Sequence, residues 1–363
     1  MGAADLQPAL PRSAYLDDTA FAAERERIFA HQWSNVARSE DVPEPGDWLR
    51  VEFAGESLLL VRDADSTLRG FYNVCRHRGA QLVPSDGPEA GHMRSMIRCP
   101  YHAWTYGLDG RFRHAPWLDG LEPERFGLHE VALDTWGGFV FVHLDSNPSA
   151  SLAEQLGAVP ERCRRYPLDA LRRGARIVYD VRANWKLVAE NYNECYHCGS
   201  VHPELCEIVP AFRQGGRGLD WENGIPHRDG AWTFTATGDS ARAPFASLDE
   251  YERTRHKGEL IYPNVLLSLS ADHVVTFRLL PDAPDRTAIV CDFLFDPAEM
   301  TRAGFDPSDA VSFWEVVNRQ DWAICESVQR GMQSRSFTGG WFAPMEDESL
   351  DISRWYRSHM GDA

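Results

Sequence analysis

The sequence contains no long hydrophobic run and has a deficit of basic residues. Its first residues lack the apolar stretch of a signal peptide, and no later segment approaches the roughly 20 apolar residues that a membrane-spanning helix needs. Lys and Arg number 37 against 54 Asp and Glu, which gives a net charge of -17 at pH 7. This balance disfavours nucleic acid and anionic membrane surfaces as partners. We therefore expect a cytoplasmic protein that binds neither nucleic acid nor membrane.

The sequence also lacks internal repeats and low-complexity tracts. Its 363 residues, 43% of them hydrophobic, are sufficient for two domains with cores of their own. Disulfide frameworks are rare in the expected compartment. The eight cysteines are therefore expected to be thiols or metal ligands.

The first part of the chain changes from a helical pattern to a strand pattern. Residues 17–33 alternate apolar and charged side chains at helical spacing, which predicts an amphipathic helix capped by Asp17 or Asp18. Residues 45–145 then consist of short β-branched and apolar runs separated by turn residues. This pattern predicts a compact all-β domain.

The second part of the chain predicts a mixture of strands and helices. A linker and a helix are expected over residues 146–170, strands alternate from Arg176 onward, and a helical pattern covers 307–331. The fold class is therefore predicted as α+β. The predicted parts are an N-terminal helical segment over 1–44 that packs on the last part, the all-β domain over 45–150 and a further domain over 151–363.

Two short motifs in the all-β region each combine one Cys with one His. They are Cys75-Arg76-His77-Arg78-Gly79-Ala80 and Cys99-Pro100-Tyr101-His102-Ala103-Trp104. Two thiolates on one iron and two imidazoles on the other describe a Rieske [2Fe–2S] cluster. The same four residues could also hold a single zinc ion.

A second group of possible metal ligands lies between Asn184 and His202. No Gly or Pro occurs from Trp185 to Cys198, so we predict one helix that Gly199 ends, with Glu194 and His197 on one face. His202 would return toward His197 from the next turn. Two His and one carboxylate suit O2 chemistry at iron. The alternative is a zinc site formed by Cys195, Cys198, His202 and Cys206.

Together, the two cysteine-histidine motifs and this segment resemble the catalytic α subunit of Rieske non-heme iron oxygenases. The family pattern N-x-x-[D/E]-x-x-H-x4-H matches Asn191, Glu194, His197 and His202. The resemblance implies that a late helix supplies the carboxylate ligand, for which Asp321 is preferred. It thus implies a cluster on Cys75, His77, Cys99 and His102 and a mononuclear Fe(II) on His197, His202 and Asp321, with Asp309, Glu315 and Glu326 as weaker carboxylate candidates.

Two variations distinguish this sequence within the family. The spacing of 21 residues between His77 and Cys99 indicates a loop insertion, in which His92 is expected to face solvent. Glu194 stands where many aromatic-ring dioxygenases of the family have Asp. In this respect the sequence resembles the branch that includes carnitine, glycine betaine and stachydrine oxygenases.

The resemblance also implies an architecture and partners. The second domain is expected to be a helix-grip domain with a curved antiparallel sheet. Electrons would come from an NAD(P)H-dependent reductase or a ferredoxin. Glu194 would bridge the cluster of one subunit to the mononuclear iron of its neighbour in a homotrimer, with Asn191 close by. Trp104 and Tyr106 are expected to shield the cluster.

The expected activity is oxidation of a small, possibly cationic substrate with O2. The preferred reaction is N-demethylation or hydroxylation of a betaine-like quaternary ammonium compound, and the alternative is mono-oxygenation of another small molecule at carbon or nitrogen. A Rieske electron carrier without oxygenase activity and a zinc protein are alternatives of other classes. An ammonium would need aromatic faces, for which the candidates are Trp221, Trp232, Phe234, Phe245 and Tyr262.

Overall fold

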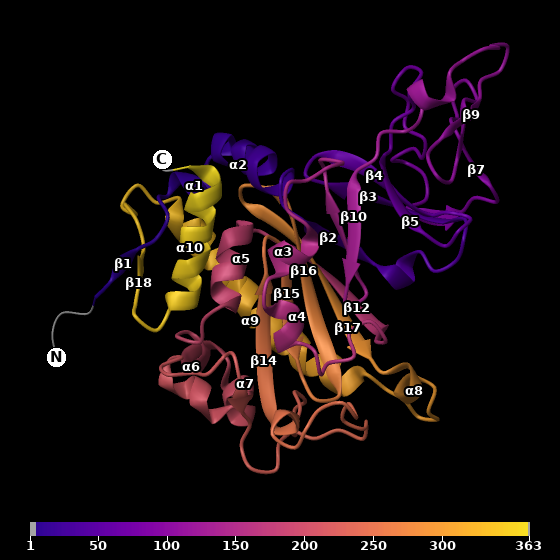
Figure 1. Cartoon of the computed structure of the whole chain (residues 1–363). Helices are drawn as coiled ribbons and strands as arrows, with labels where there is room; N and C mark the ends of the chain where they lie inside the picture. Colours follow the sequence, from indigo (N-terminus) through magenta and orange to yellow (C-terminus); the bar gives the residue numbers. More distant parts are fainter. Residues whose placement is uncertain (1–4, 362–363) are drawn as a thin grey trace. The chain divides into compact units, whose positions relative to one another are not determined.

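The computed structural model describes residues 5–361 and divides into two compact units (Figure 1). Unit 1 combines Met1–Ile28 with Leu156–Ala363, and unit 2 is Phe29–Gln155. The boundaries predicted after residues 44 and 150 differ from these. Residues 34–38 belong with unit 2 because they form a strand that pairs with residues 139–142. The ends of the predicted first and third parts, residues 1–4 and 362–363, lie outside the described residues.

Unit 2 consists mainly of antiparallel strands, as predicted. One sheet has the order β5-β4-β3-β6, and two three-stranded sheets have the orders β10-β11-β2 and β7-β8-β9. The strands are β2 (Ser34–Arg38), β3 (Asp47–Phe53), β4 (Glu56–Arg62), β5 (Leu68–Tyr72), β6 (Ala90–His92), β7 (Met96–Arg98), β8 (Thr105–Gly107), β9 (Phe112–His114), β10 (Ala132–Trp136) and β11 (Phe139–His143).

The core of unit 2 follows from the strand patterns. Trp48 on β3 points inward, and Leu59 and Val61 on β4 are fully buried between neighbouring strands. Cys75 and Cys99 belong to the same cluster of buried residues. The hydrophobic core therefore supports the two loops that carry the cysteine-histidine motifs.

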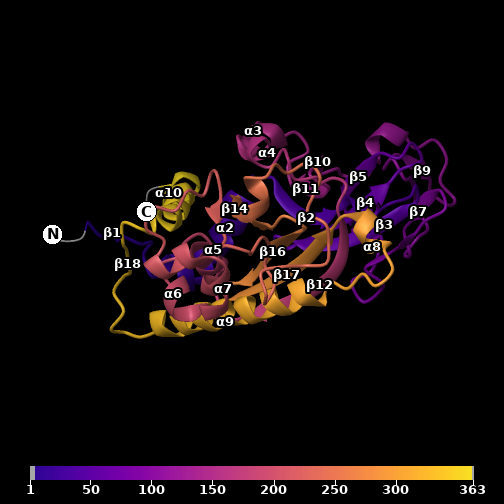
Figure 2. The same ribbon diagram turned by 90° about the horizontal axis from the view of Figure 1, so that it is seen from below.

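Unit 1 is organised around a six-stranded antiparallel sheet, and helices lie beside this sheet (Figures 1 and 2). The strand order is β12-β17-β16-β15-β14-β13. The sheet strands are β12 (Arg172–Val181), β13 (Ile225–Pro226), β14 (Arg255–Ile261), β15 (Val265–Leu269), β16 (His273–Ala283) and β17 (Arg286–Phe295), and β1 (Gln7–Pro8) pairs separately with β18 (Trp341–Phe342). Together the two units confirm the α+β fold class.

The long helix α9 runs beside the sheet of unit 1 (Figure 2) and packs on α5 and β12. Its bounds, Ser308–Met332, agree with the predicted helix over 307–331. The other helices are α1 (Ser13–Leu16), α2 (Asp18–Glu24), α3 (Leu152–Leu156), α4 (Val159–Arg162), α5 (Trp185–Tyr192), α6 (Cys198–Val201), α7 (Pro203–Ile208), α8 (Pro297–Met300) and α10 (Asp347–Met360). The predicted N-terminal helix over 17–33 is confirmed in part: α2 is followed by a π-helical turn over Arg25–Phe29, and the helix ends there. The Asp17 side chain makes no capping hydrogen bond.

A buried ion pair fixes the N-terminal helix to the helix that precedes the predicted iron ligands. Lys186 on α5 and Glu24 on α2 are both fully buried, and Lys186 Nζ lies 2.5 Å from Glu24 Oε1. The same carboxylate accepts hydrogen bonds from Trp185 Nε1 at 2.8 Å and from Tyr356 Oη at 3.1 Å. These contacts compensate the buried charges of Lys186 and Glu24, because a buried charge without a partner is costly in free energy.

Replacing Lys186 by Met should therefore destabilise unit 1 strongly. Without the ammonium, Glu24 remains buried as an unpaired carboxylate, and the expected loss is about 3–5 kcal/mol. Urea unfolding measures this change. The exposed pair between Arg286 and Asp180, 2.7 Å apart, provides the control, because Arg286→Met should cost less than about 1 kcal/mol. Equal effects of the two substitutions would contradict a structural role for the buried pair.

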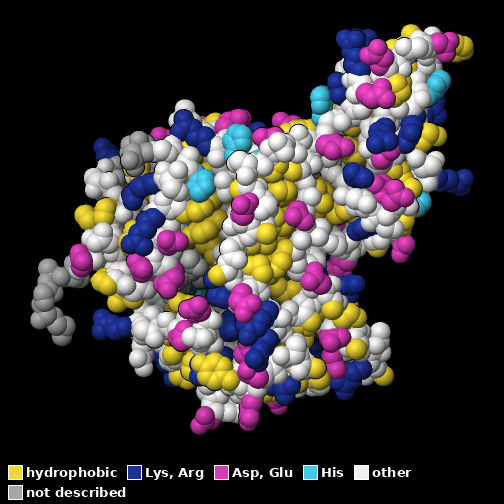
Figure 3. Space-filling view, viewed as in Figure 1, with side chains coloured by type: hydrophobic (Ala, Val, Ile, Leu, Met, Phe, Trp, Pro, Cys, Tyr) yellow, Lys and Arg dark blue, Asp and Glu magenta, His cyan; other side chains and the backbone are white. Residues whose placement is uncertain are grey.

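No helix among residues 5–361 is both long and apolar enough to cross a membrane. In the face shown in Figure 3, acidic and basic side chains are interspersed with hydrophobic ones. The eight cysteines are all buried and free.

Candidate metal centres

The two cysteine-histidine motifs form loops with matching backbone hydrogen bonds. In the first loop, Cys75 N donates to Ala80 O at 2.8 Å and Gly79 N donates to Cys75 O at 3.1 Å. Gly79 has a φ of 76°, a conformation that favours glycine. The second loop repeats the pattern: Cys99 N donates to Trp104 O at 2.8 Å, and Ala103 N, from a residue with φ 59°, donates to Cys99 O at 3.1 Å.

The four side chains of these loops fit a two-iron cluster better than a single ion. Both thiols are buried, and the rings of His77 and His102 lie 4.7 Å apart. His102 Nδ1 is buried without a hydrogen-bond partner among the described residues. No three of Cys75, His77, Cys99 and His102, all of them described, bring their ligand atoms within 4.8 Å of one another. A tetrahedral zinc ion would require that proximity.

Two aromatic residues predicted to shield the cluster lie against the residues predicted to bind it. The Trp104 ring stacks on His77 at 4.9 Å with an angle of 4° between the planes. Tyr106 is fully buried, and its hydroxyl lies 3.2 Å from Cys75 Sγ while it accepts a hydrogen bond from Arg76 N at 3.0 Å. His92, in the loop between the motifs, is exposed and pairs with Asp47 at 3.0 Å.

In unit 1, three side chains converge so that they could hold one metal ion. The distances are 3.2 Å between the Nε2 atoms of His197 and His202, 2.8 Å from His202 Nε2 to Asp321 Oδ1, and 3.4 Å from His197 Nε2 to Asp321 Oδ1. Ligands at about 2.1 Å from a metal and at right angles lie about 3 Å apart. The three atoms therefore occupy one face of a coordination sphere, and they form the one such group found among residues 5–361.

Hydrogen bonds at the other ring nitrogens orient the two imidazoles. His197 Nδ1 lies 2.5 Å from Glu194 Oε1, and His202 Nδ1 lies 2.7 Å from Gln320 Oε1. When these Nδ1 atoms donate, the Nε2 atoms carry free lone pairs that can bind one metal ion together with Asp321. Sequence reasoning missed Gln320. Its one sequence signal is its position directly before Asp321 on a helix.

The electrostatics of the triad favour a cation. Burial lowers the pKa of His197, but hydrogen bonds to Asp321, Cys198 and Glu194 outweigh this effect and raise the pKa to about 12. Burial would raise the pKa of Asp321, but the two imidazoles lower it. A metal ion can supply the positive charge that protonated imidazole supplies in its absence.

The predicted helix over Trp185–Cys198 is wrong in its extent. Helix α5 ends at Tyr192, and α6 begins at Cys198, so Gly199 lies inside a helix rather than after one. Glu194 causes the interruption: its carboxylate accepts hydrogen bonds from the backbone N–H groups of Tyr196 and His197. Such bonds compete with helical ones. The predicted proximity of Glu194 and His197 nevertheless holds.

The other candidates for ligands have different surroundings. Asn191 Nδ2 is 3.4 Å from His197 Nε2, which places it beside the triad. Asp309 pairs with Arg242 at 2.6 Å, Glu315 accepts a hydrogen bond from the Tyr179 hydroxyl, and Glu326 pairs with Arg330. The cysteines of the zinc alternative, Cys195, Cys198 and Cys206, are packed thiols outside the metal-ligand group.

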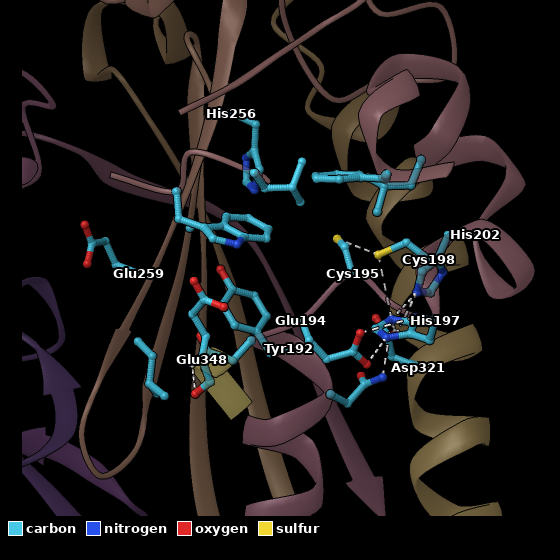
Figure 4. Close-up of a pocket in the computed structure, with 18 of the residues that line it drawn as sticks. Tyr192, Glu194, Cys195, His197, Cys198, His202, His256, Glu259, Asp321 and Glu348 are labelled. Atoms are coloured by element: carbon cyan, nitrogen blue, oxygen red, sulfur yellow. Dashed lines mark hydrogen bonds and ion pairs between the residues drawn. The ribbon is translucent and has the colours of Figure 1, made fainter. Parts of the chain in front are cut away.

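A cavity of about 700 Å³ opens at the triad (Figure 4). Of the five aromatic candidates from the sequence, Trp221 and Tyr262 line it. Phe234 and Phe245 are core residues, and Trp232 donates a hydrogen bond to Asp239. The aromatic residues that line the cavity are Tyr192, Phe212, Trp221, Tyr262 and Trp314.

Comparisons with known proteins cover both units. Residues 168–362 match the family "Ring hydroxylating alpha subunit (catalytic domain)", and residues 32–125 match "Rieske [2Fe-2S] domain". The carnitine monooxygenase oxygenase subunit of Escherichia coli K12 is 32% identical over 341 residues, covering 91% of this chain and 86% of that protein. The glycine betaine monooxygenase oxygenase subunit of Chromohalobacter salexigens is 29% identical over 385 residues, covering 97% and 85%.

A solved structure shares the fold. The quaternary ammonium Rieske monooxygenase CntA, in complex with an inhibitor, superposes with a TM-score of 0.80 at 26% identity, covering 98% of this chain and 96% of that one. Both candidate metal centres, the cluster loops and the triad, thus lie in domains that the comparisons identify. The chain belongs to the Rieske non-heme iron oxygenases as a catalytic α subunit, with a [2Fe–2S] cluster in its Rieske domain and a mononuclear iron in its catalytic domain.

Proposed function

We propose that this oxygenase oxidises a small quaternary ammonium compound. The observation that carries the proposal is the cavity at the triad, which both aromatic rings and carboxylates line. A quaternary ammonium has no N–H to donate, so aromatic faces and negative charge are the groups that attract it. The names of the carnitine and glycine betaine relatives support the same substrate class.

Within this proposal, each metal has a defined set of ligands. Bound to the chain, the cluster stores electrons and the mononuclear iron activates O2. Glu194 and Gln320 hold the imidazole rings so that both Nε2 atoms face the metal position, and the packed surroundings of Trp104 and Tyr106 keep water from the cluster thiolates. The cluster ligands are Cys75, His77, Cys99 and His102, and the iron ligands are His197, His202 and Asp321.

We also propose the partners and location implied by the family. An NAD(P)H-dependent reductase or a ferredoxin supplies electrons, and the chain forms a homotrimer in which Glu194 links the cluster of one subunit to the iron of the next. His77 is exposed and His102 is half-exposed, which supports transfer of electrons to or from the cluster at the surface around these two residues. Eight free thiols support a cytoplasmic location, where disulfides are rare.

The hydroxyl of Tyr106 should tune the cluster. It lies 3.2 Å from Cys75 Sγ, and hydrogen bonds to cluster sulfurs stabilise the reduced form. Tyr106→Phe removes a hydrogen bond of about 1 kcal/mol and should lower the reduction potential by about 40–60 mV for one electron. Spectroelectrochemistry measures the shift. An unchanged potential in a variant with a normal cluster spectrum would show that the hydroxyl does not donate to the sulfur.

Turnover of a substrate panel tests the proposed function. Purified enzyme with Fe(II), a surrogate reductase and O2 is given quaternary ammonium compounds, and formaldehyde and substrate loss are followed. Oxidation of an N-methyl group yields a hemiaminal that releases formaldehyde, so formaldehyde equal to substrate loss indicates N-demethylation. Substrate loss without formaldehyde indicates hydroxylation at carbon. If no quaternary compound reacts while the cluster reduces and reoxidises normally, mono-oxygenation of another small molecule becomes the better proposal.

A further inference from the structure

We propose that the preferred substrate carries a net positive charge and has no carboxylate at the end remote from the reacting group. This inference rests on the proposed function and narrows its substrate class. It favours ammonium cations with an uncharged or cationic far end, such as trimethylammonium alcohols or amides. Zwitterionic betaines would then be poor substrates.

The charges that line the cavity are mostly negative. Glu194 and Asp321 belong to the metal centre, and five further carboxylates line the remaining wall and mouth. Among the described residues that line the cavity, Arg162 is the one Lys or Arg side chain. The five carboxylates away from the metal centre are Asp220, Glu222, Glu259, Glu348 and Asp351.

The one guanidinium in the wall already has a partner. Arg162 Nε lies 2.7 Å from Glu259 Oε1, and Arg162 Nη2 lies 2.6 Å from Glu259 Oε2. This bidentate pair uses the two N–H groups best placed to bind a carboxylate. Glu259 is 7% exposed, so a substrate carboxylate that displaced it would leave a buried anion without its partner.

The nearby bases do not replace Arg162 as an anion site. His256 lines the cavity, but burial and the neighbouring His227 and His273 lower its pKa to about 3, so its imidazole is neutral. Lys257 lies outside the cavity lining, and its Nζ is 3.5 Å from Glu252. A substrate carboxylate therefore meets no free cation in the wall of the cavity formed by the described residues.

The acidic residues outside the metal centre lie where the far end of the substrate would be. Figure 4 shows His197, His202 and Asp321 at one side of the cavity, whereas Glu259 and Glu348 lie away from them, beyond Tyr192. The group that is oxidised must reach the metal centre. The opposite end of an extended substrate then points toward Glu259 and Glu348, where like charges repel a carboxylate and select against it.

A matched pair of substrates tests the inference. γ-Butyrobetaine and its carboxamide have the same length and the same trimethylammonium group, and they differ in the charge at the far end. With holoenzyme, reductase and O2, kcat/KM for the carboxamide should exceed that for the acid at least tenfold. Equal or faster use of the acid overturns the inference and leaves the proposed function standing. If neither compound is consumed, no other compound of the quaternary panel reacts and the cluster cycles normally, both the inference and the proposed function are overturned.

Substitution of Glu259 should change the preference. Glu259→Gln removes one charge and releases the Arg162 guanidinium, so the ratio of kcat/KM for acid over carboxamide should rise at least tenfold. Because both substrates are measured on one preparation, the ratio does not depend on the fraction of folded enzyme. Glu348→Gln, at an exposed residue of the mouth, should raise the same ratio to a smaller extent.

Glu250→Gln is the matched control. Glu250 is exposed and does not line the cavity, so its substitution removes an equal charge elsewhere and should leave the ratio unchanged. An unchanged ratio in both Glu259→Gln and Glu348→Gln overturns the inference. An equal rise of the ratio in Glu250→Gln also overturns the inference, because the preference would then depend on the net charge of the protein alone.

Discussion

Asp321→Ala should abolish turnover and remove the mononuclear iron while leaving the cluster intact. Asp321 is the single carboxylate of the triad, 2.8 Å from His202 and 3.4 Å from His197. Loss of an outer hydrogen-bond partner of a metal ligand already reduces metal affinity or activity by about 10–100-fold. Loss of the ligand itself should exceed roughly 100-fold, and iron analysis should show about one iron fewer per chain.

The cluster spectrum provides an internal reference for this variant. The cluster loops lie in unit 2 and Asp321 lies in unit 1, so absorption of the cluster and its reduction by the donor should stay normal. Glu326→Ala is the control on the same helix, because Glu326 pairs with Arg330 at 3.5 Å and lies outside the metal-ligand group. Retention of the mononuclear iron in Asp321→Ala would exclude Asp321 as its ligand.

The sequence predicts the cluster loops well because their structure is local. Each motif places its Cys and His within four residues, and each closes through backbone bonds between the Cys and residues four and five positions later. Left-handed conformations at Gly79 and Ala103 complete the turns. Short motifs of this kind carry their geometry in the sequence itself. The helix over Ser308–Met332 is predictable for a related reason, since its apolar spacing is periodic over many residues.

The remaining features depend on contacts between distant residues. Glu194 interrupts a segment that has uninterrupted helical composition, and its side chain does so through bonds that no periodicity reveals. Gln320 approaches His202 from 118 residues away, and Arg162 approaches Glu259 from 97 residues away. The family pattern identifies Glu194, but composition marks Gln320, Arg162 and Glu259 as ordinary polar residues. Only the packed sheet and helices of unit 1 place these three at the metal centre and in the cavity.

Glu194→Gln should slow turnover by more than about 100-fold while the cluster and the mononuclear iron remain bound. Two roles for Glu194 predict different behaviour. As a group that orients His197 through the 2.5 Å contact at Nδ1, it would affect iron affinity by about 10–100-fold, and excess Fe(II) would restore activity. As the proposed link between subunits, it would affect electron transfer from the cluster, and added iron would not help.

A single-turnover experiment separates these roles. Enzyme with a reduced cluster and bound Fe(II) is mixed with substrate and O2, and reoxidation of the cluster is followed by its absorption. In the wild type the cluster should reoxidise within the first turnover, whereas in Glu194→Gln it should stay reduced at full iron occupancy. Gln320→Ala is the matched control, because Gln320 orients His202 at 2.7 Å as Glu194 orients His197. Excess Fe(II) should restore the activity of the Gln320→Ala variant. If iron also restores Glu194→Gln, Glu194 acts as a positioning residue for His197, and the path between subunits runs through other groups.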